Sequence, residues 1–447
     1  MTAQQLRLPL TIQPSVQQRP DDISYRARLQ SLLSSNLDFH GKNSAYASHN
    51  FHSFPAKFPP QLPQKFIEWL TSPEDLVLDP MMGSGTAILE AFLLGRRGIG
   101  FDIDPLALRL CKAKVTPVSL TKVTETGYQV LKRAKITLQR DTASLTNLLD
   151  NRFDDTTREF VDYWFLPETQ LELMALICEI EKVQEVIVRE FLELVFSAII
   201  ITKSGGVSMA RDLAHTRPHR VSDKTPRSAI AQYHDRLKKN IQSLAELVDG
   251  TGKVILLKGD AQSLTLKDNS VDLIITSPPY ASNAIDYMRA HKFSLVWFGY
   301  SIKELSQLRG QYIGGESLID VQLLEMPEYP AQVLANIAKR DEKKAKVLHR
   351  YYSEMIKCLS EMYRVLKPGK AAIVVVGTST MRGLDTETQT CLGKIGESLG
   401  FDLVNIAVRK LDRDKRMMPA RRNAQPNSQI EERMHEEYVI GLYKPDY

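Results

Sequence analysis

The chain has 447 residues, of which 43% are hydrophobic and 25% are charged. This is the composition of a soluble globular protein that is long enough for more than one average domain. The net charge of +5 allows a nucleic-acid partner without establishing one, and the four scattered cysteines lack the spacing of a metal site. The first residues form no signal-peptide pattern, and charged side chains within the most apolar stretch, 183–202, exclude a membrane span.

The N-terminal third predicts the cofactor half of a doubly wound α/β sheet. Residues 1–44 are polar and proline-containing, so a loose, flexible arm with a short helix at 22–34 is expected. A helix at 62–70 leads into a strand at 76–80. A glycine-rich turn, a helix at 87–94 and a strand at 98–104 follow. Strand, glycine turn, helix, strand and acid in this order are typical of a nucleotide-cofactor site.

The details of this turn favour a particular ligand. Gly83 and Gly85 allow the backbone to approach a ligand closely, and Asp102 can accept the hydroxyls of a ribose. Ile88 stands where a third glycine would complete a dinucleotide motif, and no lysine follows Gly85 as in an ATP-binding loop. Asp79 would repel a phosphate but suits a cationic ligand such as S-adenosylmethionine.

The middle and C-terminal parts of the chain differ in periodicity. Apolar residues at three- and four-residue spacing predict an inserted helical region over 118–250, a candidate DNA-contacting region. Two strands, at 254–257 and 271–275, then resume the sheet. Beyond them we expect helices at 286–298 and 329–366, a turn at 367–369, a strand at 371–376 and an antiparallel pair at 401–410 and 438–443.

The segment Thr276–Tyr280 predicts a rigid turn at the end of a buried strand. Two consecutive prolines cannot extend a sheet, because each fixes φ and lacks an N–H group. The Ser277 hydroxyl and the Pro278 carbonyl can accept hydrogen bonds from an exocyclic amine, and Tyr280 can stack on the ring that carries it. Accepting both N–H groups frees the nitrogen lone pair for direct, in-line attack on an electrophile.

Four segments together resemble the amino-methyltransferases of DNA, specifically the N4-cytosine type. They are the cofactor motif 79–86, the catalytic motif 276–280, the segment 54–59 and the turn 258–261. The resemblance implies a Rossmann-like class I methyltransferase fold, with a cofactor-binding part at 45–117 and a catalytic part at 251–447. It also implies direct, in-line methyl transfer from S-adenosylmethionine to the N4 amine of a cytosine flipped out of duplex DNA. The chain has no Pro-Cys pair, which carbon-5 methylation would require. Adenine-N6 methylation, RNA amino-methylation and a non-catalytic nucleic-acid-binding protein remain alternatives.

The resemblance also assigns roles to residues of this chain. The catalytic residues are Ser277, Pro278, Pro279 and Tyr280. The expected cofactor contacts are Phe54, Lys57, Phe58, Asp79, Pro80, Met81, Gly83, Ser84, Gly85, Thr86, Asp102, Ile103, Asp260 and Ala261, with Asp260 meeting the adenine amine. No metal is expected. Four of these residues could instead have a purely structural role. Asp102 could cap a helix, Asp260 could end a strand, Lys57 could be a solvated surface lysine, and Phe58 could be a core residue.

Basic side chains in three places are candidate DNA contacts, although a solvated surface explains each of them equally well. They are Arg211, His215, Arg217, Arg220, Arg289, Lys292 and Arg416. The last belongs to a basic run at 409–422 that could follow phosphates. Double-stranded DNA is the expected partner. The resemblance also allows a second partner, a restriction endonuclease encoded by a separate gene. The expected location is the cytoplasm of a prokaryote, at the nucleoid.

Overall fold

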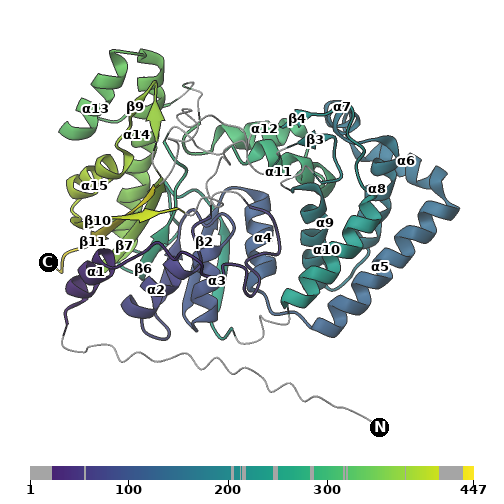
Figure 1. The fold of residues 1–447 in the computed structure, drawn as a ribbon, viewed down its shortest axis with the longest axis horizontal. Coiled ribbons are helices and arrows are strands. Elements are labelled where there is room, and N and C mark those ends of the chain that lie inside the picture. Colours follow the sequence, from purple (N-terminus) through teal and green to yellow (C-terminus); the bar gives the residue numbers. More distant parts are fainter. Residues whose placement is uncertain are drawn as a thin grey trace, which may run out of the picture.

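A computed structural model describes residues 23–54, 57–202, 206–211, 213, 218–244, 250–281, 286–315, 318, 321–377, 379–411 and 436–446. Figure 1 shows a sheet lobe on the left and a lobe of long helices on the right. No helix within these ranges has the length and apolar character needed to cross a membrane.

The described residues build a seven-stranded sheet in the order β10-β11-β7-β6-β1-β2-β5. Five neighbouring strands run parallel, and β11 runs antiparallel between β7 and β10. The bounds are β1 Leu76–Asp79, β2 Arg97–Asp102, β5 Lys253–Lys258, β6 Val271–Thr276, β7 Leu366–Gly377, β10 Asp402–Lys410 and β11 Glu436–Tyr443. The α/β class, the doubly wound sheet and the antiparallel closing strand are confirmed.

Both faces of the sheet are covered by helices, because successive side chains of a strand point to opposite faces. Val77, Leu273 and Ile275 pack with one set of helices, and Leu78 and Ile274 pack with the other. The first set is α1 Tyr25–Ser34, α2 Gln61–Leu70 and α3 Thr86–Leu93; the second is α13 Glu328–Ala338, α14 Glu342–Val365 and α15 Thr388–Ser398.

The helical lobe packs against the sheet lobe through α4 Pro105–Val115. It consists of α5 Leu120–Arg140, α6 Thr142–Arg152, α7 Asp155–Trp164, α8 Pro167–Glu181, α9 Val186–Ile200 and α10 Ala229–Leu244, with a small ribbon of β3 Ala210–Arg211 and β4 His219–Arg220. Helix α11, Met288–Leu295, contacts α4, α9 and α12, Ile302–Gly310, so it lies between the two lobes. A short 3-10 turn, Val296–Phe298, follows α11.

Two sequence expectations differ from the structure. The expected arm is not loose over α1, because Leu29, Leu32 and Leu33 are buried against the sheet. The expected turn at 367–369 lies inside β7, where Gly369 has a φ of 72° and the pairing with β6 shifts register. The residues Lys367–Lys370 therefore form an irregular segment within the strand rather than the end of a helix.

Candidate active site

Two turns that are far apart in the sequence leave the same edge of the sheet. β1 and β6 are adjacent and parallel, with Val77 opposite Leu273 and Leu78 opposite Ile274. The glycine turn follows the carboxyl end of β1, and the turn at Ser277 follows the carboxyl end of β6. The chain order of the sheet reverses between these two strands. In open α/β sheets, ligands bind in the crevice outside the strand ends at this switch point.

The glycine turn has a backbone that only glycine adopts without strain. Gly83 and Gly85 have φ angles of 48° and 74°. A Cβ added at Gly85 would overlap the Sγ atom of Cys111, so α4 packs directly beneath the turn. The buried ammonium of Lys114 donates to the Ser84 carbonyl at 2.7 Å. The turn is thus held from below by α4 and Lys114, and we call its opposite face the glycine cradle.

Two carboxyl groups border this cradle. Asp102 ends β2 and accepts the Gly83 N–H at 2.8 Å and the Asp104 N–H at 2.8 Å. Burial and the neighbouring charge of Asp104 raise the pKa of Asp102 to about 7. Asp79 is 2% exposed and accepts the Met81 N–H at 3.2 Å, and burial likewise raises its pKa to about 7. Both carboxyl groups therefore favour a ligand that supplies positive charge or hydroxyl donors.

Asp104 joins the cofactor half to the segment after the second turn. It caps α4, as predicted, by accepting the N–H groups of Leu106 and Ala107. Its other oxygen accepts His291 Nδ1 at 2.6 Å and the Tyr312 hydroxyl at 2.7 Å. Burial alone would raise the pKa of Asp104, but His291 and these hydrogen bonds outweigh it and hold the pKa below its ordinary value. Sequence reasoning missed this link, because its partners are 187 and 208 positions apart.

The segment before the glycine turn covers the cradle from one side. The Phe54 ring lies 3.3 Å from the position of a Cβ on Gly83 and stacks on Tyr287 with ring centroids 5.0 Å apart. Lys57 is exposed as a whole residue, but its ammonium donates to the His49 carbonyl at 2.6 Å, and burial of this group lowers its pKa to about 8. Phe58 is 6% exposed and packs in the core with Phe66.

The remaining cofactor candidates lie around the same edge. Pro80, Ser84, Thr86 and Ala261 are buried, and Met81 and Ile103 are half-buried. Asp260 follows β5, is half-exposed and accepts the Gln262 N–H at 2.9 Å. The Gly259 N–H donates to the Asp102 carbonyl at 3.1 Å, which joins the ends of β5 and β2.

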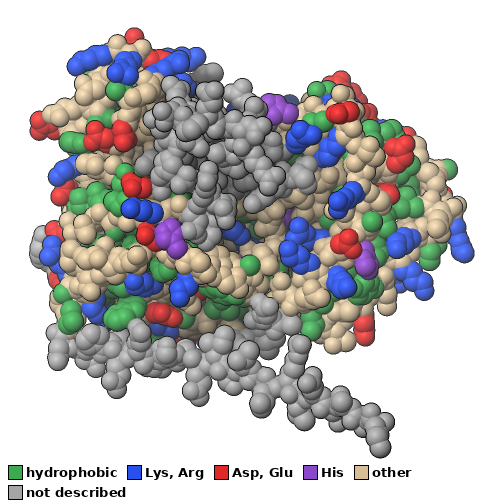
Figure 2. Space-filling model, in the orientation of Figure 1, with side chains coloured by type: hydrophobic (Ala, Val, Ile, Leu, Met, Phe, Trp, Pro, Cys, Tyr) green, Lys and Arg blue, Asp and Glu red, His purple; other side chains and the backbone are tan. Residues whose placement is uncertain are grey.

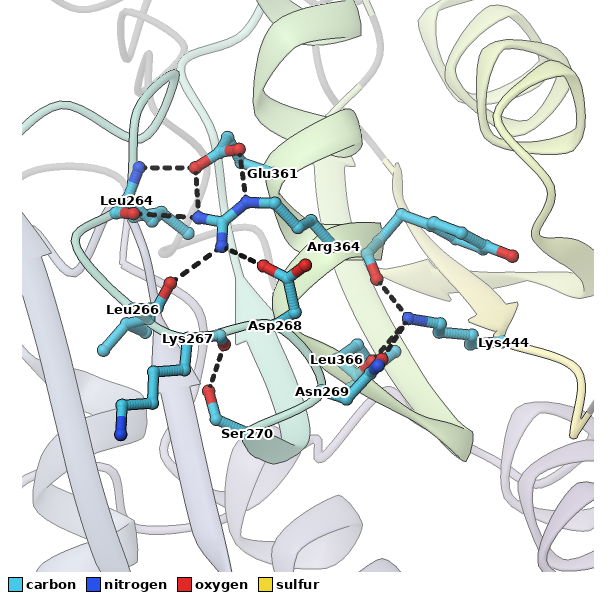
Figure 3. A network of polar contacts seen from close by, with 11 residues as sticks. Leu264, Leu266, Lys267, Asp268, Asn269, Ser270, Glu361, Arg364, Leu366 and Lys444 are labelled. Carbon is cyan, nitrogen blue, oxygen red and sulfur yellow. Dashed lines mark hydrogen bonds and ion pairs between the residues drawn. The ribbon is translucent and has the colours of Figure 1, made fainter.

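The loop between β5 and β6 is fixed by Arg364 of α14. Its guanidinium donates to the carbonyls of Leu264 and Leu266 and to the carboxylates of Asp268 and Glu361, at 2.7–2.9 Å (Figure 3). Glu361 in turn accepts the Leu264 N–H at 2.7 Å. This network determines how the chain passes from the Asp260 turn into the strand that ends at Ser277.

The turn of Thr276–Tyr280 is bound to β11. Ser277 and Pro279 are half-buried, Pro278 is buried and Tyr280 is 6% exposed. The Tyr280 hydroxyl lies 3.1 Å from Glu437 Oε1. Burial and the neighbouring charge of Glu437 raise the pKa of Tyr280 well above its ordinary value. The predicted stacking ring is thus packed inside the protein, and Glu437, which the sequence did not single out, is its partner.

Arg409 does not belong to a phosphate track, contrary to expectation. It is 3% exposed, pairs with Glu437 and donates to the Leu37 carbonyl at 3.1 Å. The reason is that its strand, β10, pairs with β11 and faces the segment after α1. Position 416 in the same basic run lies outside the described residues.

The other DNA-contact candidates lie on α11, between the two lobes, and on the β3–β4 ribbon of the helical lobe. On the face in Figure 2, Lys and Arg side chains occur on both lobes. Arg289 and Arg309 share the carboxylate of Asp286, which leaves an excess of positive charge beside the second turn. Lys292 lies over the Phe160 ring at 5.0 Å.

Arg211 and Arg220 lie on the β3–β4 ribbon of the helical lobe. Arg211 is exposed. Arg220 donates to the Tyr163 carbonyl at 2.7 Å and lies over the Tyr163 ring. His215 and Arg217 lie outside the described residues.

This architecture defines a class of protein. A Rossmann-like methyltransferase has three parts that this chain also has. They are a parallel sheet with an antiparallel strand next to its edge, a glycine turn after one strand, and an acid at the end of the neighbouring strand. A family model described as DNA methylase (N6_N4_Mtase) matches residues 25–113 and 271–440. The chain belongs to this family, which confirms the resemblance to the DNA amino-methyltransferases. It is an S-adenosylmethionine-dependent DNA methyltransferase.

Two curated relatives match most of the chain, and a third matches a short segment of it. The type II methyltransferase M.MvaI of Kocuria varians is 26% identical over 385 residues, which are 80% of this chain and 83% of the relative. The type II methyltransferase M.AvaI of a Nostoc species is 21% identical over 420 residues, 86% of this chain and 85% of the relative. M.PvuII of Proteus hauseri is 47% identical over 51 residues, 11% of this chain and 15% of the relative.

Proposed function

We propose that the protein methylates the N4 amine of cytosine in duplex DNA. The observation that carries this proposal is the position of Ser277. This serine begins the turn after β6, and β6 is the strand next to β1, which leads into the glycine turn. A neutral hydroxyl at this position suits the cytosine amine, whereas an acid or an asparagine would favour adenine. An adenine-N6 enzyme is the second candidate, because serine does not strictly separate the two.

The residues of the cradle fit S-adenosylmethionine. Gly83 and Gly85 offer a surface without side chains, with Phe54 beside it. Asp102 would accept the ribose hydroxyls, Asp79 would face the positive charge, and Asp260 would meet the adenine amine. When bound, the cofactor supplies an activated methyl group on a sulfonium.

The second turn would hold the target amine. The Ser277 oxygen and the Pro278 carbonyl would each accept one N–H, which reduces the delocalisation of the nitrogen lone pair into the ring. Alignment of the nitrogen with the donor then supplies most of the acceleration, because positioning alone is worth several powers of ten. One amine proton leaves after the methyl group has been accepted.

A base inside a duplex cannot reach this turn, so the target must be flipped out, at a cost of a few kcal/mol. The cluster of Arg289, Arg309 and Lys292 is proposed to contact phosphates next to the flipped base. The helical lobe, 118–250, with Arg211 on its ribbon, is proposed to contact the duplex on the other side. The relatives named as type II methyltransferases support a role with a separate restriction endonuclease.

The test uses tritiated S-adenosylmethionine and plasmid DNA from a host without DNA methyltransferases. The DNA is digested to nucleosides, and the labelled nucleoside is identified by mass spectrometry. The proposal predicts N4-methylcytosine. Label in N6-methyladenine would select the second candidate, and cofactor binding without any transfer to DNA would contradict the proposed activity.

The matched variant is Ser277→Ala. Loss of an acceptor worth about 1.5–3 kcal/mol lowers turnover roughly 10- to 100-fold, while the affinity for S-adenosylhomocysteine stays near that of the wild type. Ser306→Ala, which changes an exposed serine of α12, is the control and keeps full activity. Unchanged turnover in Ser277→Ala would contradict the role of the hydroxyl.

A further inference from the structure

We propose that one end of the sheet lobe contacts the phosphates of duplex DNA, on the side of the site away from the helical lobe. We call this end the basic tip. It consists of residues 339–346, which join α13 to α14, and of the hairpin of β8, Thr380–Met381, and β9, Leu384–Asp385. The inference rests on the proposed function and adds a surface of the sheet lobe to the DNA contacts proposed on α11 and on the helical lobe.

The basic tip carries a surplus of positive charge. Its basic side chains outnumber its three acidic ones, and they gather where Figure 1 labels α13 and β9 (Figure 2). In the part of the chain that the structure describes, two of the basic residues are in ion pairs with Asp341 and Glu342, whereas Lys339, Arg340 and Lys343 are exposed and form none. The basic residues are Lys339, Arg340, Lys343, Lys344, Lys346 and Arg382.

Hydrogen bonds hold the two segments of the tip together. Asp341 caps α14 by accepting the Lys344 N–H at 3.0 Å, and its other oxygen accepts Arg382 Nε at 2.7 Å. Arg340 donates to the Arg382 carbonyl at 3.1 Å. The hairpin is anchored from beneath by Met381, which is 6% exposed in the core. The charges of the tip are thus carried on a fixed backbone, which lowers the entropic cost of binding a ligand.

The position of Arg382 supports a role for its side chain outside the fold. Arg382 and Gly383 form the two-residue turn of the hairpin, with φ angles of 53° and 76°. Such turns strongly favour Asn, Asp or Gly, because both residues need a positive φ. The Arg382 side chain is 60% exposed, so core packing does not explain an arginine there. Residues in strained backbone conformations cluster at functional sites.

The hairpin leaves the sheet at the edge where the candidate active site lies. β7 is adjacent and parallel to β6, with Val374 opposite Thr276. Thr276 directly precedes Ser277, and β7 ends at Gly377, three residues before β8 begins. The hairpin therefore follows the strand next to the catalytic turn, at the same end of that strand.

The start of α14 extends beyond this edge. α14 ends at Val365, and the next residue, Leu366, is opposite the first residue of β6. α14 has 24 residues and is about 36 Å long, whereas β6 has 6 residues and spans about 20 Å. The first turns of α14 thus project roughly 15 Å past the end of β6, and Figure 1 shows them beside β9. A duplex whose base enters the site would pass close to this projection.

The chemistry of the tip fits phosphates better than a protein partner. Protein interfaces are usually anchored by buried aromatic or aliphatic side chains. Among the described residues of the tip, no large hydrophobic side chain is exposed. Phosphates, by contrast, need only Lys and Arg side chains placed along their path.

The test measures the affinity for a fluorescein-labelled duplex as the salt concentration is varied. Each phosphate contact that is lost lowers the slope of log K against log salt by about 0.9. The triple variant Lys339→Gln, Lys343→Gln and Arg382→Gln is expected to lower the slope by about 2–3 and to raise Kd roughly 10- to 100-fold at about 0.1 M salt. Duplexes of unrelated sequence lose the same affinity, because phosphates carry no sequence information.

A matched triple variant controls for net charge. Arg97→Gln, Lys253→Gln and Lys267→Gln also remove one arginine and two lysines, all of them exposed. Arg97 and Lys253 begin β2 and β5, and Lys267 precedes β6, so these residues lie at the opposite edge of the sheet. Screening by salt limits their effect on Kd to less than about threefold.

Two further measurements separate DNA contact from folding and from the chemical step. In plasmid methylation, the tip variant has a raised KM for DNA, whereas its kcat at saturating DNA stays within about twofold of the wild type. Arg382→Gly relieves the backbone strain and removes only an exposed ion pair, so it keeps or raises the urea midpoint of unfolding. The same substitution weakens duplex binding roughly three- to tenfold.

An unchanged Kd and salt slope in the tip variant would overturn the inference. An equal loss in the control variant would overturn it as well, because only net charge would then matter. The proposed function fails in a different way: a wild-type protein that binds the duplex but transfers no methyl group to plasmid DNA would contradict it and leave the basic tip as a DNA contact.

Discussion

Replacing His291 by Ala tests the link between the two halves of the site. His291 is 1% exposed, and its Nδ1 atom lies 2.6 Å from the Asp104 carboxylate, which is itself buried. The ring also lies against Phe54 and Tyr287, at centroid distances of 5.5 and 5.7 Å. The variant therefore loses one bond to a charged group and two ring contacts.

The size of the effect follows from these contacts. A hydrogen bond to a charged group is worth about 1.5–3 kcal/mol, and aromatic contacts add about 0.5–1.5 kcal/mol. Asp104 keeps three other donors, Leu106, Ala107 and Tyr312, so its carboxylate is not left without partners. The expected loss in the free energy of unfolding is thus about 2–4 kcal/mol, below the larger cost of abandoning a buried charge.

The assay is urea unfolding followed by the fluorescence of tryptophan, since Trp297 is fully buried directly after α11. His291→Asn, whose amide can donate to Asp104, recovers part of the loss. His40→Ala, at an exposed histidine near Asp38, is the control and changes stability by less than about 0.5 kcal/mol. A loss below about 0.5 kcal/mol for His291→Ala would refute the reasoning.

Two further predictions concern the cofactor cradle. The affinity for S-adenosylmethionine is expected to rise as the pH increases through about 7, because Asp79 and Asp102 have pKa values raised to about 7 and must ionise to bind it. Calorimetry at pH 6 and pH 8 measures the two affinities, and the Asp102→Asn substitution reduces the difference between them. Equal affinities of the wild-type protein at both pH values would contradict the prediction. Gly85→Ala lowers the free energy of unfolding by at least about 2 kcal/mol, because a φ of 74° is strained and the new methyl group meets Cys111. The control is Gly310→Ala, at a helical site with free space, which leaves the free energy of unfolding unchanged or slightly higher. If both substitutions lower the free energy of unfolding by the same amount, the packing argument for Gly85 is wrong.

The elements that local sequence determines were predictable. β1, the glycine turn and β2 follow from an apolar run, two glycines and an acid, and the capping of α4 by Asp104 follows from the Asp-Pro pair. The turn at Ser277 follows from its prolines. The meeting of these turns at one edge follows from the rules of doubly wound sheets, once the strands are assigned.

The contacts between distant segments were not predictable. Tyr280 and Glu437 are 157 positions apart, and nothing near Glu437 in the sequence marks it as different from its acidic neighbours. From the sequence, Arg409 is interpreted as part of a solvated basic run. The sequence alone does not reveal that its strand pairs with β11, which buries it. The burial of α1 was missed for a similar reason: its polar residues outnumber the three leucines that pack on the sheet.

The most direct test of the central claim is a crystal structure of the protein with S-adenosylhomocysteine. The two-turn site predicts that the ligand lies on Gly83 and Gly85, with its ribose at Asp102 and its sulfur facing Ser277 and Pro278. Ligand density at another edge of the sheet, or a sulfur separated from Ser277 by packed side chains, would contradict the claim.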